Sequence, residues 1–233
     1  MAASNSVAAV VGIEKVSQEF LDLVCAMAGR LGTHPDWHLA VMANESGFSP
    51  SITNSIGATG LIQFIPSTAK RLGTTTDELR GMSREEQLFW VEKYYAPFAG
   101  RMHDVEDVYM ATFMPAHVGR GSDNIIAVKG QKVYDQNASL DRNKDGVLTN
   151  GDVGSVVRGH LAKAQSKPRI PVNCDATFGG GSSDESPFSK GRSPRWGSGP
   201  DSNSGGTSPG VDEAALERII PSINVDIGDD DHE

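Results

Sequence analysis

The stretch that most constrains this chain runs from Asn44 to Gln63, with the sequence NESGFSPSITNSIGATGLIQ. It places a single glutamate, Glu45, directly before a glycine-containing loop. The preceding residues, HPDWHLAVMANE, predict a helix that is capped by Asp36 and ends near Glu45. On that helix Val41 and Met42 share a face with Glu45, because residues three and four apart are neighbours. The pattern therefore predicts an acidic side chain at the end of an apolar helix face.

The position of Glu45 is typical of a general acid. A carboxyl group held against apolar side chains is penalised when it ionises, so we expect the pKa of Glu45 to lie above its usual range. A carboxyl group of this kind stays protonated near neutral pH and can give its proton to a leaving oxygen. The alternative interpretation is a helix-terminal carboxylate that only faces solvent.

Two motifs, Glu45-Ser46 and the run GATGLIQF at residues 57–64, resemble the ES and GLMQ motifs of soluble lytic transglycosylases. The likeness continues in order from about Ser17 to Leu161 and is closest to phage-encoded versions. It implies a lysozyme-like fold and cleavage of the MurNAc-GlcNAc β-1,4 bond of peptidoglycan. It also implies a mechanism with one carboxylate: Glu45 protonates the leaving group, the N-acetyl group of the sugar assists, and the muramoyl 6-hydroxyl closes a 1,6-anhydro ring. No cofactor is expected for this catalysis.

The same resemblance gives roles to residues around Glu45. Ser46 would help to hold the substrate or the acid, and Gln63 would hydrogen-bond the glycan or orient Glu45. Gly57 and Gly60 permit positive φ and a close approach of the backbone to a sugar ring, although glycines at such positions are also ordinary turn residues. The neighbouring apolar residues are expected in the core: Leu61, Ile62 and Phe64.

The third family motif is altered here. Where soluble enzymes carry Ala-Tyr-Asn, this chain has Thr112-Phe113-Met114. The aromatic ring is kept as Phe113, a candidate substrate contact, but the phenol and the amide are lost. Tyr134 matches the later tyrosine of the family that hydrogen-bonds the catalytic glutamate. The alternative for Tyr134 is a half-buried tyrosine whose hydroxyl lies in water.

A second motif, DRNKDGVLTNGD at residues 141–152, matches the spacing of an EF-hand calcium loop. Gly146 would make the sharp turn, and Leu148 would anchor the loop to the core. Asp152 stands where glutamate is usual, so its shorter arm weakens Ca²⁺ binding or favours Mg²⁺. The alternative is an acidic turn without an ion; with one, its role would be structural. The predicted oxygen ligands are Asp141, Asn143, Asp145, the Val147 carbonyl, Thr149 and Asp152.

Composition favours one domain followed by a tail. The 233 residues are 38% hydrophobic, and residues 1–165 alternate apolar helical patches with short Gly or Pro breaks and show no run of alternating strands. We therefore expect a mainly α domain over residues 1–165, and the resemblance implies that its fold is lysozyme-like. Residues 166–233 are rich in Pro, Gly and Ser, which predicts a linker or a wrapping tail. Within it, residues 211–220 can form a short docking helix. The predicted helical segments of the domain are SQEFLDLVCAMAGRLG, PDWHLAVMANES, PSTAKRLG, TTDELRGM, SREEQLFWVEKYYAPFAGRM, DVEDVYMATFMPAHVG and GDVGSVVRGHLAKAQ.

Charge, hydropathy and cysteine content limit the classes of partner and site that we expect. Of the net charge of −9, residues 166–233 carry −6 and residues 1–165 carry −3, so no basic surface for nucleic acid is expected. No run of about twenty apolar residues predicts a membrane span, and no signal peptide is recognised. Cys25 and Cys174 are interpreted as free thiols. His34 and His38, four residues apart, are interpreted as solvated histidines rather than zinc ligands.

The leading hypothesis is a virion-associated enzyme of a phage tail that cleaves peptidoglycan glycan strands in the host periplasm or cell wall. Tail proteins are candidate partners of the C-terminal segment. Two alternatives stay open. One is a hydrolytic muramidase, which would need a second carboxylate or a well-held water. The other is a structural tail component that uses a lysozyme-like domain for binding or assembly.

Overall fold

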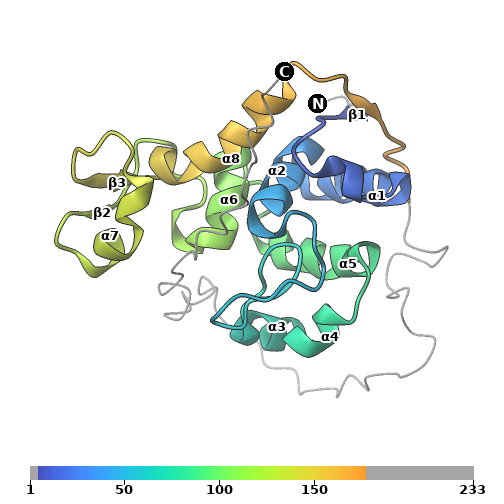
Figure 1. Cartoon of the computed structure of the whole chain (residues 1–233), viewed down its shortest axis with the longest axis horizontal. Coiled ribbons are helices and arrows are strands. Elements are labelled where there is room, and N and C mark those ends of the chain that lie inside the picture. Colours follow the sequence, from blue (N-terminus) through green and yellow to red (C-terminus); the bar gives the residue numbers. More distant parts are fainter. Residues whose placement is uncertain (1–4, 177–233) are drawn as a thin grey trace, which may run out of the picture.

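The computed structural model describes residues 5–176 and is mainly helical in this range (Figure 1). Each of the seven predicted helical segments forms a helix, and α7, ahead of the predicted calcium loop, is an addition. The α-helices are α1 (Gln18–Leu31), α2 (Pro35–Ser46), α3 (Pro66–Leu72), α4 (Thr76–Arg80), α5 (Arg84–Tyr95), α6 (Val105–Phe113), α7 (Lys132–Asn137) and α8 (Asn150–Ala164). Short 3-10 turns are η1 (Ile13–Lys15), η2 (Ala96–Phe98), η3 (Pro115–His117) and η4 (Ala138–Leu140).

Four short strands supplement the helices. β1 (Ser6–Val7) pairs antiparallel with β4 (Ile170–Pro171), which brings the two ends of the described chain together. β2 (Ile125–Val128) pairs antiparallel with β3 (Val147–Thr149) in a small lobe that also holds α7 (Figure 1). These strands were not predicted, because two to four residues are too few to display an alternating pattern.

Helix α2 lies at the centre of the fold and contacts α1, α6 and α8. Its residues Leu39 to Met42 are all fully buried, so the helix is surrounded on every side rather than on one face. His38 is also buried, at 1% exposure, and its Nε2 lies 2.7 Å from the hydroxyl of Thr33. The interpretation of His38 as a solvated histidine was therefore wrong. Burial lowers the pKa of His38 to about 3.

The start of α2 also differs from the prediction. The N-cap is His34, whose Nδ1 accepts the backbone N–H of Asp36, and Pro35 occupies the first turn. Asp36 is instead a buried carboxylate that accepts the backbone N–H of Ala8 at 2.7 Å. It also receives two hydrogen bonds from the guanidinium of Arg169, at 2.9 and 3.2 Å. A residue expected to cap a helix thus ties three distant segments together.

Helices α6 and α8 pack closely because α8 carries a glycine where they meet. A Cβ at Gly154 would lie 2.5 Å from Cγ of Glu106 on α6, which is closer than real side chains allow. Glu106 is 6% exposed and pairs with Arg158 of α8 and with the hydroxyl of Ser122. The close approach therefore fixes the position of the β2–β3 lobe relative to the body.

The described body extends beyond the predicted domain boundary at Gln165. Residues 166–176, which we call the strap, run back along α1 and the N-terminal segment and include β4. Cys174 of the strap forms a disulfide with Cys25 of α1, with the Cα atoms 4.8 Å apart. The interpretation of these cysteines as free thiols was wrong, because a pairing across 149 residues leaves no local spacing pattern.

The remaining residues of the predicted tail, including the short helix expected at 211–220, lie outside the described residues. Within residues 5–176, no helix is both long and apolar enough to cross a membrane.

Candidate active site

Glu45 is half-buried in the last turn of α2. The helix ends at Gly47, whose φ of 54° and backbone N–H bonds to Met42 and Ala43 form a left-handed cap. Phe48 follows with a φ of 65° and a fully buried ring, and its carbonyl accepts the Nε–H of Arg84 at 2.6 Å. The chain after Glu45 is therefore held by both backbone geometry and packing.

Ser46 and Gln63 support the loop that follows Glu45. The hydroxyl of Ser46 is directed to the carbonyls of Met42, at 3.1 Å, and Leu61, at 3.0 Å, which joins the loop to the end of α2. Gln63 is 5% exposed, with a φ of 53°, and its amide donates to the carbonyl of Gly60 at 3.1 Å. Both side chains therefore hydrogen-bond backbone carbonyls and hold the backbone of the loop in place.

The glycines of the loop have different surroundings. Both adopt the predicted positive φ, 80° at Gly57 and 81° at Gly60. A Cβ at Gly57 would make only an ordinary contact with Pro66, at 3.5 Å. A Cβ at Gly60 would lie 2.4 Å from Oε1 of Gln87. The close approach that requires glycine at position 60 is thus to a protein side chain.

Gln87, on α5, is a support that the sequence did not reveal. It is fully buried, and its Oε1 accepts the N–H of Leu61 at 2.9 Å. Its Nε2 donates at 2.6 Å to the carbonyls of both Pro50 and Leu79. One glutamine therefore fastens both ends of the loop to α5. In the sequence Gln87 reads as one more polar residue in REEQ, without a distinguishing signal. The expected core residues Leu61, Ile62 and Phe64 are buried, as predicted.

Asn44 and Tyr109 are further residues that sequence reasoning missed beside Glu45. The Nδ2 of Asn44 lies 3.5 Å from Oε1 of Glu45 and 3.4 Å from the hydroxyl of Tyr109. Tyr109, on α6, is fully buried, and its ring stacks on Phe113 with centroids 6.0 Å apart. Phe113, expected at the substrate, is 2% exposed and belongs to the core. The α6 hydroxyl group that contacts Asn44 therefore comes from Tyr109, one turn before the altered motif.

Tyr134 does not take the expected position. Its hydroxyl donates to Oδ2 of Asp141 at 2.6 Å, within the β2–β3 lobe, and not to Glu45. This hydrogen bond, followed by burial, raises the pKa of Tyr134 to about 12. The same hydrogen bond, with the backbone N–H groups of the loop, lowers the pKa of Asp141. Tyr134 was assigned by its order in the chain, but it lies on α7, where it contacts the first residue of the predicted calcium loop.

The predicted calcium loop is an ordered turn between α7 and α8. Oδ1 of Asp141 accepts the N–H of Lys144, and its Oδ2 accepts the N–H of Gly146, where φ is 84°. Asp152 bonds the N–H and hydroxyl of Thr149 and thereby caps α8. Leu148 is fully buried, as expected. Within residues 5–176, no three His, Cys, Asp or Glu side chains are grouped so as to hold a metal ion.

A pocket of about 360 Å³ lies at the start of α2, at the opposite end from Glu45. Its wall combines Trp37, Leu161 and Ala164 with polar groups of His34, Lys167 and Arg169. Asp36 and Glu45 are nine residues apart, about 13 Å along a helix. The pocket is therefore separate from the candidate acid.

Comparison with known protein families finds a match for one segment of the chain. Residues 22–93 match the family model described as Transglycosylase SLT domain. This segment includes α2 from its start to Glu45, the loop with Gly57 and Gly60, and α5 with Gln87. The match covers less than half of the chain and stops before α6.

Curated relatives match over a similarly short stretch. The chain is 41% identical over 59 residues to Membrane-bound lytic murein transglycosylase C of Actinobacillus pleuropneumoniae serotype 5b (strain L20). The same protein of serotype 3 (strain JL03) matches with the same identity and length. The aligned stretch is 25% of this chain and 16% of each relative. No solved structure matches the chain.

Proposed function

We propose that this protein is a peptidoglycan-cleaving lytic transglycosylase in which Glu45 is the catalytic acid. The observation that carries the proposal is the placement of Glu45. It is half-buried at the end of a buried helix, beside a loop held by Ser46 and Gln87, within the segment that matches the transglycosylase SLT model. A rigid, partly desolvated carboxyl group is what proton donation to a glycosidic oxygen requires.

The proposed reaction uses one carboxyl group. Glu45 would give its proton to the leaving oxygen of the MurNAc-GlcNAc bond while the N-acetyl group of the sugar stabilises the positive anomeric carbon. The Glu45 carboxylate would then accept the proton of the muramoyl 6-hydroxyl as that oxygen closes a 1,6-anhydro ring. The acid next along the chain, Asp77, has a side chain that is 83% exposed and pairs with Arg80. This exposed position gives no support to Asp77 as a second catalytic carboxylate.

The test compares wild type with Glu45→Gln on isolated peptidoglycan, with released products resolved by mass. Glu19→Gln is a matched control because it changes an exposed glutamate of α1 in the same way. We expect wild type and Glu19→Gln to release products about 18 Da lighter than hydrolytic ones, since internal ring closure replaces addition of water. Glu45→Gln should release none. Products of ordinary hydrolytic mass would make the protein a muramidase, and no release by wild type would favour an assembly role.

We also propose that the protein acts as part of a phage particle during penetration of the host cell wall. The support is the ordered likeness to phage-encoded transglycosylases beyond residue 93, together with a C-terminal segment of low-complexity composition. Mass spectrometry of purified particles tests this directly. Recovery of the chain with tail proteins is the expected result, and its absence from intact particles would contradict the proposal.

The loop at residues 141–152 is proposed to bind a structural Ca²⁺. Asp141, Asn143 and Asp145 already lie in one hydrogen-bonded turn, with Asn143 donating to Asp145 at 2.8 Å. The short Asp152 is engaged with Thr149, so this site fits calcium only in part. We expect the melting temperature to rise by a few degrees in millimolar CaCl₂, because an ion that binds only the folded state stabilises it.

The control for calcium is a variant outside the loop. Asp141→Asn should remove the CaCl₂ effect, whereas Asp123→Asn should keep it. MgCl₂ in parallel distinguishes the two ions. A wild-type melting temperature that is equal in CaCl₂ and in EDTA would make the loop a turn without an ion.

A further inference from the structure

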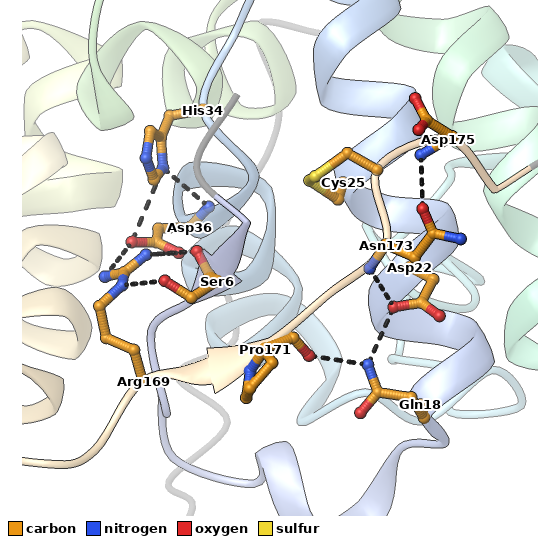
Figure 2. Close-up of a disulfide and its surroundings, with 11 residues drawn as sticks. Ser6, Gln18, Asp22, Cys25, His34, Asp36, Arg169, Pro171, Asn173 and Asp175 are labelled. Carbon is orange, nitrogen blue, oxygen red and sulfur yellow. Dashed lines mark hydrogen bonds and ion pairs between the residues drawn. A yellow bond between two sulfur atoms is a disulfide. The ribbon is translucent and has the colours of Figure 1, made fainter. Parts of the chain in front are cut away.

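The strap is joined to the body by one covalent link. Cys174 bonds to Cys25 on α1, whose side chain is 3% exposed. The Cα separation of 4.8 Å lies within the range that a disulfide spans. Figure 2 shows Cys25 beside the strap, close to Asn173 and Asp175. The two partners come from the beginning and the end of the described chain.

Hydrogen bonds hold the strap residues that precede Cys174 against α1 and against the start of α2. On the side of α1, Gln18 donates to the carbonyl of Pro171 at 2.9 Å, and the N–H of Asn173 donates to Asp22 at 2.8 Å. On the side of α2, Arg169 bonds both Asp36 and Ser6 (Figure 2). The strap therefore connects the beginning of α2 to α1 and to β1.

These noncovalent contacts are mostly exposed to water. The side chain of Arg169 is 44% exposed, and Pro171, Asn173 and Asp175 are exposed as well. Exposed hydrogen bonds and ion pairs contribute little each, because water competes for both partners. Segments with few buried apolar contacts open more easily than the rest of a fold. Ile170, Val172 and Ala176 of the strap are only partly buried against the core. The disulfide adds to these contacts a covalent link between positions 149 residues apart, so oxidation favours the closed strap.

We propose that Cys25 and Cys174 form an oxidative modification site whose closure latches the strap onto the body. The reagent class is a thiol–disulfide oxidant, either a protein or a small-molecule disulfide. Disulfides persist in oxidising compartments, whereas cytosolic thiols are kept reduced. The chain thus folds with an open strap where it is made and acquires the latch after it meets such an oxidant. This inference is independent of the proposed enzymatic activity.

The chemistry proceeds in two exchange steps. The thiolate of Cys174 attacks one sulfur of the oxidant, which breaks the disulfide of the oxidant and releases one thiol. The thiolate of Cys25 then attacks the mixed disulfide at Cys174 and releases the second thiol. Two protons pass from the protein thiols to the products, so the protein is oxidised by two electrons and the oxidant is reduced by two. Cys174 reacts first because it is half-buried, while Cys25 is enclosed.

Opening of the strap would reach the start of α2. Arg169 would leave Asp36, a 7% exposed carboxylate that would then keep the N–H of Ala8 and the ring of His34, whose Nδ1 lies 3.6 Å from its Oδ2. Burying a carboxylate without its cation is unfavourable. The redox state of two cysteines near α1 is thereby coupled to the stability of the helix that ends at Glu45.

The test is hydrogen exchange of the full chain, followed by mass spectrometry, before and after reduction. In the oxidised protein we expect the strap peptide to be protected and the intact mass to be about 2 Da lower, since two hydrogens are lost. On reduction, exchange in residues 166–176 should rise by roughly tenfold or more, while α6 stays protected. The melting temperature should fall by on the order of 10 °C.

Two variants keep this test decisive. Cys174→Ser should behave as the reduced protein in the presence of oxidant. Gln18→Ala, which removes one strap hydrogen bond and leaves the disulfide, should stay protected. If Cys174→Ser does not fold, the reduced wild type gives the same comparison without a substitution. Equal strap exchange in oxidised and reduced wild type would overturn the latch, as would alkylation of both cysteines in the oxidised protein without prior reduction.

Discussion

The two ends of α2 each carry an acidic residue, and their surroundings differ. At the start, Asp36 is 7% exposed and is held by Arg169 and by the N–H of Ala8. At the end, Glu45 is half-buried, and the Asn44 amide lies 3.5 Å from its carboxyl oxygen. The first carboxylate is neutralised by a fixed cation, as a structural group would be. The second has a supported backbone and a more accessible side chain, which suits proton transfer.

The largest expected effect is a loss of catalytic activity, from a substitution at the Glu45 end of α2. Glu45→Gln should lower glycan cleavage by about 10³-fold or more, because an amide cannot donate the proton that the leaving oxygen needs. Its melting temperature should stay close to that of wild type. Cleavage rate and melting temperature are measured on the same preparations. Nearly full activity in the Glu45→Gln protein would contradict the assignment of Glu45 as the catalytic acid.

The loop beside Glu45 should be sensitive at Gly60 and tolerant at Gly57. Gly60→Ala is expected to cost about 3 kcal/mol of unfolding free energy, from positive φ and the clash with Gln87. Gly57→Ala has a similar φ without the clash and should cost only about 1 kcal/mol. Denaturant unfolding of both variants gives the difference. Equal losses would mean that Gln87 moves aside at little cost.

A substitution at the start of α2 should lower the stability of the protein and leave its catalytic activity unchanged. Arg169→Met removes the cation beside buried Asp36 and is expected to cost about 2 kcal/mol. Activity per folded molecule should remain near that of wild type, since the change lies at the far end of the helix. Chemical denaturation and a cleavage assay at low temperature check both parts. A large loss of activity in the folded variant would show that the two ends are coupled.

The middle of α2 predicts a pH dependence of stability. Burial lowers the pKa of His38 to about 3 from 6.5, so the unfolded chain binds a proton that the folded protein excludes. The stabilisation that depends on a neutral His38 is therefore fully present above pH 6.5. It is lost as pH falls from 6.5 towards 3. By about pH 5 the loss should be on the order of 2 kcal/mol. Unfolding of wild type and His38→Gln across this range measures it, and parallel pH profiles would contradict the assignment.

The smallest effect is expected at Tyr109. Tyr109→Phe removes the hydroxyl that lies 3.4 Å from the Asn44 amide, so Asn44 should hold Glu45 less firmly. We expect cleavage to fall by a few-fold, about 1 kcal/mol in the barrier. Phe113→Leu, which changes the stacked neighbour without removing a hydroxyl, is the control. A shifted pH profile of the rate in Tyr109→Phe alone would assign the effect to Glu45, whereas identical profiles would assign it to packing.

Much of the helical fold was readable from the sequence because caps, glycine breaks and apolar patches are local signals. Ser17 and Ser83 cap α1 and α5 through bonds to residues three positions ahead, and Gly32 and Gly73 end α1 and α3 with positive φ. The same logic failed at Asp36, which has the right residue type in nearly the right place. A partner 133 residues away, Arg169, binds the carboxylate instead, and no local pattern reports it.

The candidate site was predicted in part. The position of Glu45 at the end of α2, the positive φ of both loop glycines and the buried residues of GATGLIQF agree with the structure, whereas the catalytic role of Glu45 stays a prediction. The roles of Ser46 and Gln63 at a glycan stay predictions, since their described hydrogen bonds are to backbone. Gln87 and Tyr109 were missed because each reaches the site from another helix. Tyr134 was assigned by chain order, and the β2–β3 lobe places it beside Asp141 instead.

The sequence by itself determined where the helices other than α7 lie, that α2 is apolar and ends in an acid, and that a loop with two glycines of positive φ follows. These properties depend on neighbours a few residues away, which set backbone conformation and local burial. Only the tertiary structure decided that Asp36 pairs with Arg169, that Gln87 fastens the loop, and that Cys25 meets Cys174. Each of these contacts joins segments that are distant in the chain, so it forms only when the folded core brings both partners together.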